Sequence, residues 1–193
     1  SGDHIVEQAC HSVDKLVWAL GDQDPVSAIA HGGRQQRVES RYGNIFDHFS
    51  VVYDFAGGER GFLFCRQMEN CTGSNDDYIM GTKGCAKIQA FGNLEITGEN
   101  PWRLTNRTGV GMYQQEHNEL FASIRKGEAK NDGDWMMRST LMAIMGRESA
   151  YTGRRLSWED IKSSAQKLMP ENLSWDMELP EPPIPMPGRT EFI

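Results

Sequence analysis

Apolar and polar positions along the chain change their spacing, and the change divides the sequence into regions. Over residues 3–20, apolar side chains recur every three to four positions, which predicts an amphipathic helix. Asp3 is its expected N-cap and Gly21 its expected stop. Residues 26–31 predict a short strand, and the polar, glycine-bearing stretch 32–44 predicts a loop.

Alternating side chains then predict a β-hairpin from two strands at 45–55 and 60–68, joined by the glycines of "AGGE". The expected faces are Ile45, Phe49, Val51, Tyr53 and Phe55 on the first strand, and Phe62, Phe64, Arg66 and Met68 on the second. Asp47 and Ser50 are among the other positions of the first strand. Further short strands flank a Gly81–Gly84 turn and occupy "GNLEITG", so the sheet is expected to be antiparallel.

Helical spacing returns in the second half of the chain. Residues 112–127 and 134–151 predict two helices, with Asn131 or Asp132 as the cap of the second. A last helix is expected to begin at Ser157, where "SWED" has the pattern of a capping box. Its acid is Asp160, its hydrophobic staple is Leu156 with Ile161, and Pro170 follows its end.

The order of elements predicts one α+β domain over residues 1–193, with an open, predominantly antiparallel sheet and helices packed on one face. Its expected parts are a helix at 1–20, a mainly β region at 26–98, a helical region at 111–169 and a proline-rich tail at 170–193. No glycine-rich nucleotide motif accompanies a strand–helix junction.

Composition narrows the possible partners. The 193-residue chain has 38% hydrophobic residues, enough for a core, and a formal net charge of −7, which argues against nucleic acid. No apolar run is long enough for a membrane span, and the four cysteines lack the spacing of a zinc site. We expect no nucleic-acid or membrane partner and favour a cytoplasmic protein, with periplasmic export of a longer parent chain as the alternative.

The opening helix carries His4, Glu7 and His11 at spacings of three and four residues. The two histidines are seven residues apart, about 10 Å along a helix, which is too far for both to bind one metal ion readily. We therefore expect no metal. Glu7 and His11 are four residues apart, so the carboxylate can orient the imidazole as a general base; ordinary polar residues without chemistry are the alternative.

The stretch "GDHIVEQACHSVDKLVWALG" resembles the helix that opens the C-terminal domain of the Gfo/Idh/MocA oxidoreductases, the glucose-fructose oxidoreductase and inositol dehydrogenase family. Glu7, His11 and Asp14 match that family's carboxylate, histidine and aspartate, although the first is usually Asp. The likeness continues through "GNIFDHFSVVYDF", "GTKG", "YQQEHNELFASIRKG", "STLMAIMGRESAYTGRRLSWED" and "PPIPMPG".

The resemblance implies the substrate-binding and oligomerisation domain of an NAD(P)-dependent oxidoreductase acting on a sugar, a cyclitol or a related polyol. His11 and Glu7 would be the catalytic residues. The family's N-terminal Rossmann domain and its catalytic lysine have no counterpart in this sequence. We therefore expect NAD or NADP to bind mainly to that missing domain, and this chain alone to be inactive and to lack tight cofactor binding.

Three more residues are candidate substrate contacts: His48, Arg66 and His117. Arg66 has a plain structural alternative as a solvated or salt-bridged residue, and His117 has one as a satisfied, half-buried histidine. In the family, substrate contacts lie on part of the helix-covered side of the sheet, and the open face often forms subunit interfaces. The apolar residues of the hairpin therefore predict a homo-oligomer.

Two other functions fit the same resemblance. One is a non-catalytic member that binds a sugar or regulates a partner. The other is an NAD-dependent glycoside hydrolase or lyase that oxidises its sugar transiently.

Overall fold

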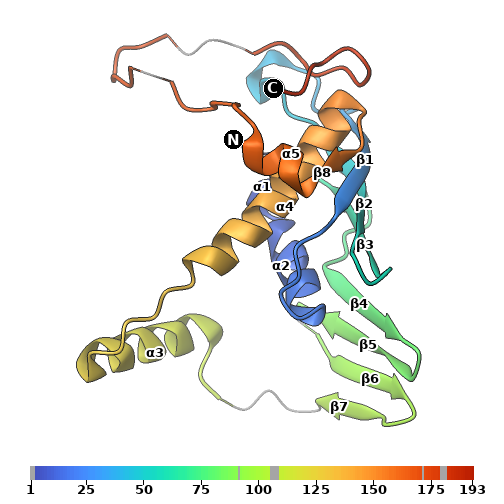
Figure 1. The fold of residues 1–193 in the computed structure, drawn as a ribbon, viewed down its shortest axis with the longest axis vertical. Coiled ribbons are helices and arrows are strands. Elements are labelled where there is room, and N and C mark those ends of the chain that lie inside the picture. The colour runs from blue at the N-terminus through green and yellow to red at the C-terminus, as the bar shows by residue number, and fades with distance from the viewer. Residues whose placement is uncertain (1–2, 91, 105–108, 171, 179–181) are drawn as a thin grey trace. The chain divides into compact units, whose positions relative to one another are not determined.

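The computed structural model describes residues 3–90, 92–104, 109–170, 172–178 and 182–193, which form helices and two four-stranded antiparallel sheets (Figure 1). The helices are α1 (Asp3–Glu7), α2 (Cys10–Ala19), the 3-10 helix η1 (Ser40–Tyr42), α3 (Met112–Lys126), α4 (Gly133–Thr152) and α5 (Trp158–Ser163). The strands are β1 (Ser27–Gly33), β2 (His48–Asp54), β3 (Arg60–Arg66), β4 (Asp76–Gly81), β5 (Gly84–Gln89), β6 (Leu94–Gly98), β7 (Trp102–Leu104) and β8 (Leu156–Ser157).

The chain divides into two compact units. The first contains Ser1–Cys71 and Trp135–Ile193, and the second contains Thr72–Asp134. The first unit holds a sheet with strand order β3-β2-β1-β8, and the second holds the sheet β4-β5-β6-β7 together with α3. The predicted α+β class and antiparallel pairing are confirmed, but the strands form two sheets rather than one. Among the described residues, no helix is long and apolar enough to cross a membrane.

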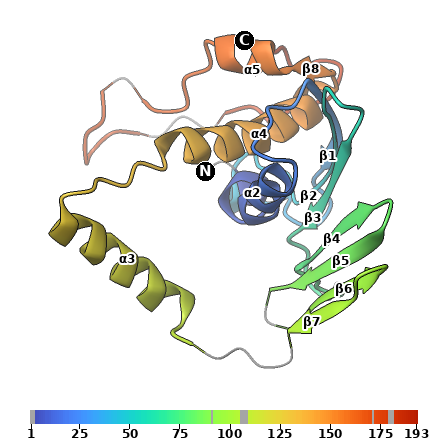
Figure 2. The same cartoon turned by 60° about the horizontal axis from the view of Figure 1, so that its bottom comes forward.

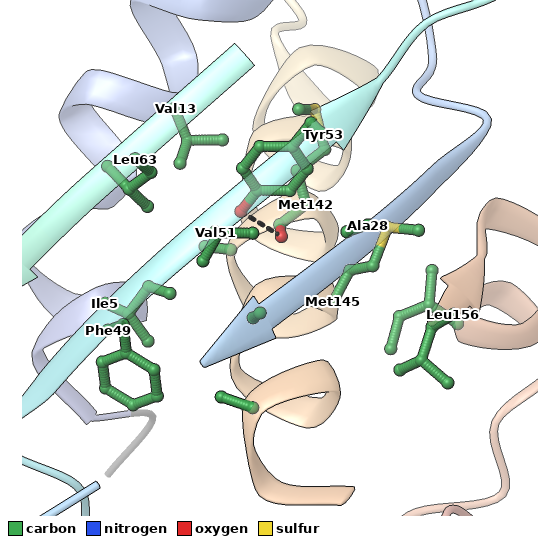
Figure 3. Close-up of a cluster of buried hydrophobic side chains, with 14 of the residues drawn as sticks. Ile5, Val13, Ala28, Phe49, Val51, Tyr53, Leu63, Met142, Met145 and Leu156 are labelled. Carbon is green, nitrogen blue, oxygen red and sulfur yellow. Dashed lines mark hydrogen bonds between the residues drawn. The ribbon is translucent and has the colours of Figure 1, made fainter. Parts of the chain in front are cut away.

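The core of the first unit lies between one face of its sheet and the helices α1, α2 and α4, which lie on the same side of β1–β3 (Figure 1, Figure 2). The β1–β2–β3 register places Ala30, Val51 and Leu63 side by side, and all three are buried. The Tyr53 hydroxyl donates a hydrogen bond of 2.9 Å to the Met142 carbonyl of α4 (Figure 3). The predicted hairpin and its buried face are therefore confirmed.

Glycines allow the helices to approach this sheet closely. A Cβ atom on Gly61 of β3 would lie 2.2 Å from Cδ2 of Leu16 on α2. A Cβ atom on Gly146 of α4 would lie 2.8 Å from the Tyr53 hydroxyl and 3.1 Å from Cγ2 of Val51. Because real Cβ atoms do not come so close, the packing of both helices depends on these residues having no side chain.

The predicted continuous helix over 3–20 is interrupted. The His4 carbonyl accepts hydrogen bonds from both the Gln8 and the Ala9 amides, each of 2.9 Å. This wide turn takes up one extra residue, as π-type turns do, and separates α1 from α2. Gly21 follows the helix with φ of 70°, as expected of a stop.

Asp3 does more than begin this helix. Its carboxylate is buried and accepts a 2.5 Å hydrogen bond from the Tyr151 hydroxyl and a 3.1 Å bond from the Phe46 amide. Burial raises the pKa of this carboxyl, and the hydrogen bonds from Tyr151 and Phe46 oppose that rise. Asp3 thereby ties the start of the chain to α4 and to the segment before β2.

The second unit has a sheet with two different faces. The strand register puts Ile79, Ala86, Ile96 and Trp102 in one row across the sheet. The neighbouring row on this face contains Ile88, Leu94 and Leu104. The opposite face carries polar groups, including the 3.1 Å ion pair of Lys87 with Asp76.

The last helix, α5, begins where the sequence predicts but is shorter than predicted. Ser157 caps α5 reciprocally with Asp160, and Leu156 and Ile161 are both buried, which confirms the capping box and the staple residues. The Asn131 side chain accepts a 3.0 Å hydrogen bond from the Gly133 amide at the start of α4. However, α5 ends at Ser163, so residues 164–169 are not helical.

Candidate functional site

The exposed face of α2 carries His11, the predicted general base, and its neighbours on the helix. Val13 and Val17 face the core and are buried, which turns His11 and Trp18 to the exposed side of the same helix. Asp14 lies at the edge between the two faces and is half-buried. His11, Asp14 and Trp18 therefore form a strip along α2, which we call the α2 strip.

The side chain of Asp14 is held by a hydrogen bond from a residue that is distant in the sequence. Its carboxylate accepts a hydrogen bond from the indole nitrogen of Trp135 on α4. The Trp135 ring in turn lies 6.2 Å from the Trp18 ring, centroid to centroid, at an interplanar angle of 51°. A second contact between the same regions is the 2.6 Å ion pair of Arg138 with Asp24. These contacts connect the α2 strip to the start of α4.

Glu7 lies within the wide turn that the His4 carbonyl and the Ala9 amide close, whereas His11 follows it. Both side chains are exposed. The extra residue in the turn rotates α1 relative to α2, so a spacing of four no longer places Glu7 directly above His11. Within the described part of the chain, no hydrogen bond joins the Glu7 carboxylate to the His11 ring. Their pairing stays a prediction.

His4 lies in a different environment from His11. It is 5% exposed, and its ring centroid is 5.3 Å from that of Phe49. Burial lowers the pKa of His4, so the neutral ring is favoured. The Nε2 atom of His4 is buried without a hydrogen-bond partner. His4 therefore belongs to the core, while His11 belongs to the surface.

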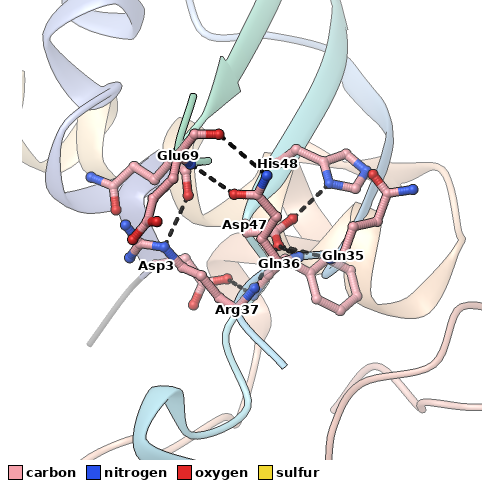
Figure 4. A network of polar contacts seen from close by, with 9 residues as sticks. Asp3, Gln35, Gln36, Arg37, Asp47, His48 and Glu69 are labelled. Carbon is pink, nitrogen blue, oxygen red and sulfur yellow. Dashed lines mark hydrogen bonds and ion pairs between the residues drawn. The ribbon is translucent and has the colours of Figure 1, made fainter. Parts of the chain in front are cut away.

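A second polar cluster surrounds Asp47, immediately before β2 (Figure 4). The Asp47 side chain is fully buried, although the sequence did not place it with the apolar face of this strand. Its Oδ2 accepts the backbone N–H groups of Gln35, Gln36 and Arg37 at 2.7, 2.8 and 3.1 Å. Its Oδ1 lies 2.8 Å from Nδ1 of His48.

This arrangement controls the charge of Asp47. Burial acts to raise its pKa, but the hydrogen bonds from His48 and the three amides outweigh burial and lower the pKa to about 2. The carboxylate therefore stays charged at any ordinary pH, and it holds the segment 35–37 against the start of β2. A charge-assisted cluster of this kind is a strong structural tie.

The structure brings two of the three candidate substrate contacts together. His48 and Arg66 are direct partners in the β2–β3 register, so both lie on the open face of the sheet, opposite the helices. His117 lies in the other unit, exposed on α3, with its Nδ1 2.7 Å from the Tyr113 carbonyl oxygen. The substrate-binding roles of His48, Arg66 and His117 stay predictions.

Sequence reasoning missed Asp47 and Trp135 as organising residues. The partners of Asp47 come from a loop ten to twelve positions earlier, and Trp135 is 121 positions from Asp14. Neither partnership produces a periodic or local motif. The only available signal was an acidic residue beside a histidine at the start of an aromatic strand.

Comparisons with known proteins place this fold among oxidoreductases. No family model and no curated protein matches the sequence. Among solved structures, UDP-N-acetylglucosamine 3-dehydrogenase GnnA from Acidithiobacillus ferrooxidans matches with a TM-score of 0.61 and 15% identity over 72% of this chain and 44% of its own. The aldose-aldose oxidoreductase from Caulobacter crescentus, complexed with glycerol, matches with a TM-score of 0.63 and 18% identity over 77% and 45%.

A third neighbour is the WlbA dehydrogenase from Bordetella pertussis in complex with NADH and UDP-GlcNAcA, with a TM-score of 0.56 and 17% identity over 78% of this chain and 43% of its own. The chain has the fold of these oxidoreductases. At such identities the likeness establishes the fold, and it confirms the architecture that the resemblance to the Gfo/Idh/MocA oxidoreductases predicted. The chain spans about half the length of these structures.

Proposed function

We propose that this chain is the substrate-binding and oligomerisation domain of an NAD(P)-dependent oxidoreductase that acts on a sugar, a cyclitol or a related polyol. The observation that carries the proposal is the α2 strip. An exposed histidine, His11, stands on a helix that is anchored from behind by buried Val13 and Val17 and from the side by Asp14 and Trp135. The shared fold with sugar-acting dehydrogenases supports it.

In the proposed reaction, His11 is the general base. Oxidation of a secondary alcohol breaks one C–H and one O–H bond and forms a C=O bond. The imidazole of His11 accepts the hydroxyl proton, and the exposed position of the ring leaves it open to a substrate. Glu7, four positions earlier and also exposed, orients the protonated ring once substrate is bound; catalytic hydrogen bonds of this kind often tighten only in the complex.

A nicotinamide supplies the hydride acceptor in such oxidations, and this chain does not fit the role of holding it. All strand pairs in the described residues are antiparallel, and consecutive strands are not linked by crossover helices. A dinucleotide cradle of the Rossmann type needs parallel strands with a glycine-rich turn leading into a helix. We therefore propose that NAD or NADP binds mainly to another part of a longer protein.

The oligomerisation role rests on the open face of the first sheet. Phe62 and Phe64 on β3 are 60% and 73% exposed, and Ile29 and Val52 extend the same face onto β1 and β2. An exposed apolar face of this size is typical of a protein interface. Its use by a second copy of the chain is the simplest reading, because identical faces make a closed two-fold dimer.

The proposal is tested by cofactor binding and turnover together. The full-length protein should oxidise at least one member of a panel of sugars, cyclitols and polyols with NAD or NADP, measured by reduced-nicotinamide absorbance. Residues 1–193 alone should show no NADH binding by calorimetry at micromolar concentrations. Tight binding of NADH to the isolated chain would contradict the assignment of the cofactor to another part of the protein.

A further inference from the structure

We propose that Trp18 and Trp135 form a subsite for a second sugar ring, so that the substrate is a disaccharide or another glycoside with two rings rather than a free monosaccharide. The inference rests on the proposed function and adds to it the size of the substrate. It starts from an aromatic pair that neither the core nor the proposed proton transfer uses.

The pair forms an open aromatic corner. Trp18 is 66% exposed although it sits on a helix whose other face is core, and the Trp135 ring meets it at 51° with 6.2 Å between centroids. The Trp135 ring cannot turn freely, because its indole nitrogen donates to the Asp14 carboxylate. Asp14 is thereby a positioning residue for the corner.

The corner is aligned with His11. The two residues His11 and Trp18 are seven positions apart on α2, which puts them on one face, two turns or about 10 Å apart along the axis. A single hexose ring at His11 does not reach across two turns, whereas a second, linked ring does. The reacting ring would lie at His11 and the second ring against the tryptophans.

The chemistry of the corner suits a carbohydrate. The faces of an indole ring are electron-rich, and the axial C–H bonds of a pyranose present a weakly positive, apolar surface to them. Binding sites combine such apolar walls with a few placed polar groups, and here the polar groups are His11 and the edge of Asp14.

The test is a calorimetric titration of the chain with two-ring sugars, cellobiose and maltose, and with single-ring controls, glucose and myo-inositol. A two-ring sugar should bind more tightly than either single-ring control. Trp18→Ala should weaken its binding about tenfold, the loss expected when one aromatic contact is removed, and leave the single-ring sugars unchanged. Trp18→Phe should restore most of the affinity, because the stacking face is kept.

Trp175 supplies the matched control, since it is 103% exposed and far from α2 in sequence. Trp175→Ala should bind every sugar as the unsubstituted chain does. Equal effects of Trp18→Ala and Trp175→Ala, equal weakening of one-ring and two-ring sugars, or no binding of either disaccharide at millimolar concentrations would each overturn the proposal. So would a change in oligomeric state on Trp18→Ala, which would mark the corner as a protein interface.

Failure of the second-ring subsite can be distinguished from failure of the proposed oxidoreductase function. His11→Asn in the full-length protein removes the proposed base and should abolish turnover, whereas the ratio of two-ring to one-ring affinity should persist because both tryptophans are unchanged. If turnover depends on His11 while Trp18→Ala changes nothing, only the subsite is wrong. If disaccharides bind through Trp18 but no substrate is oxidised, the subsite stands and the redox assignment fails.

Discussion

The two sheets have similar alternating strands but very different surroundings. In the first unit, one face of the sheet is covered by α1, α2 and α4, and Phe49, Val51 and Tyr53 of β2 are buried almost completely. In the second unit, Ile79, Ile96 and Trp102 of the corresponding apolar face remain 40–50% exposed. Among the described residues of Thr72–Asp134, Ser123 is the only buried one.

The difference shows that alternation specifies a strand but not a core. In each of the two sheets, neighbouring strands are joined by antiparallel backbone hydrogen bonds. Only the first also removes a large apolar area from water, which is the main favourable contribution to folding. We therefore expect the first unit to determine the stability of the chain and the second to respond weakly to substitution of its apolar residues.

The largest effect is expected from a matched pair of isoleucines. Ile5→Ala removes a side chain that is fully buried among α1, β2 and α4, and should lower the free energy of unfolding by about 2–5 kcal/mol. Ile96→Ala removes one that is 41% exposed and should cost less than about 1 kcal/mol. Urea unfolding followed by circular dichroism measures both. Equal losses would mean that the second sheet is as deeply buried in solution as the first.

The next effect concerns the buried carboxylate of the first unit. Asp47→Asn keeps the shape but removes the charge that accepts three backbone amides and His48, and should cost about 2–4 kcal/mol at neutral pH. Asp54→Asn on the same strand removes exposed ion pairs with Arg60 and Arg155 and should cost less than about 1 kcal/mol.

The pH dependence of that loss gives an independent check. The pKa of Asp47 is about 2 in the folded chain against an ordinary value of 3.8, so its charge stabilises the fold above about pH 4. This contribution disappears as pH falls through 2. The stability difference between the unsubstituted chain and Asp47→Asn should therefore shrink from neutral pH to pH 2, measured by unfolding at each pH. A difference that stays constant would show that the carboxylate is not held as an anion.

The smallest of these effects compares the exposed faces. Phe64→Asp on β3 should weaken self-association at least tenfold, because it places a charge in the proposed interface. Met80→Asp, at a residue that is 83% exposed on the polar face of the second sheet, should leave association unchanged. Sedimentation velocity over a range of concentrations distinguishes the two. A chain that is monomeric before either substitution removes the basis for the interface.

Local signals in the sequence predicted the local structure well. The hairpin of β2 and β3 follows from alternation and a glycine turn, and the start of α5 follows from the Ser157–Asp160 capping box, because all of these contacts lie within a few residues. The division into two units has no such local cause. It depends on which apolar sheet faces are covered by helices. The spacing of residues within a strand does not encode this.

The candidate site was only partly predictable for the same reason. The helical period predicts that Val13 and Val17 share one face, and the structure shows both buried, with His11 exposed. The wide turn before His11 could not be foreseen, since neither Gln8 nor Ala9 is a helix breaker. The burial of Asp47 and the Trp135–Asp14 hydrogen bond depend on tertiary packing, so no local spacing in the sequence predicts them.

The most direct test of the central claim is the turnover of the full-length protein after removal of a single imidazole. His11→Ala should lower kcat/KM for NAD(P)-linked oxidation about 10²–10⁴-fold, the range for loss of a general base. His31→Ala is the matched control, because His31 is also exposed but lies on β1, and it should retain full activity. Equal activity of His11→Ala and His31→Ala would contradict the assignment of His11 as the base.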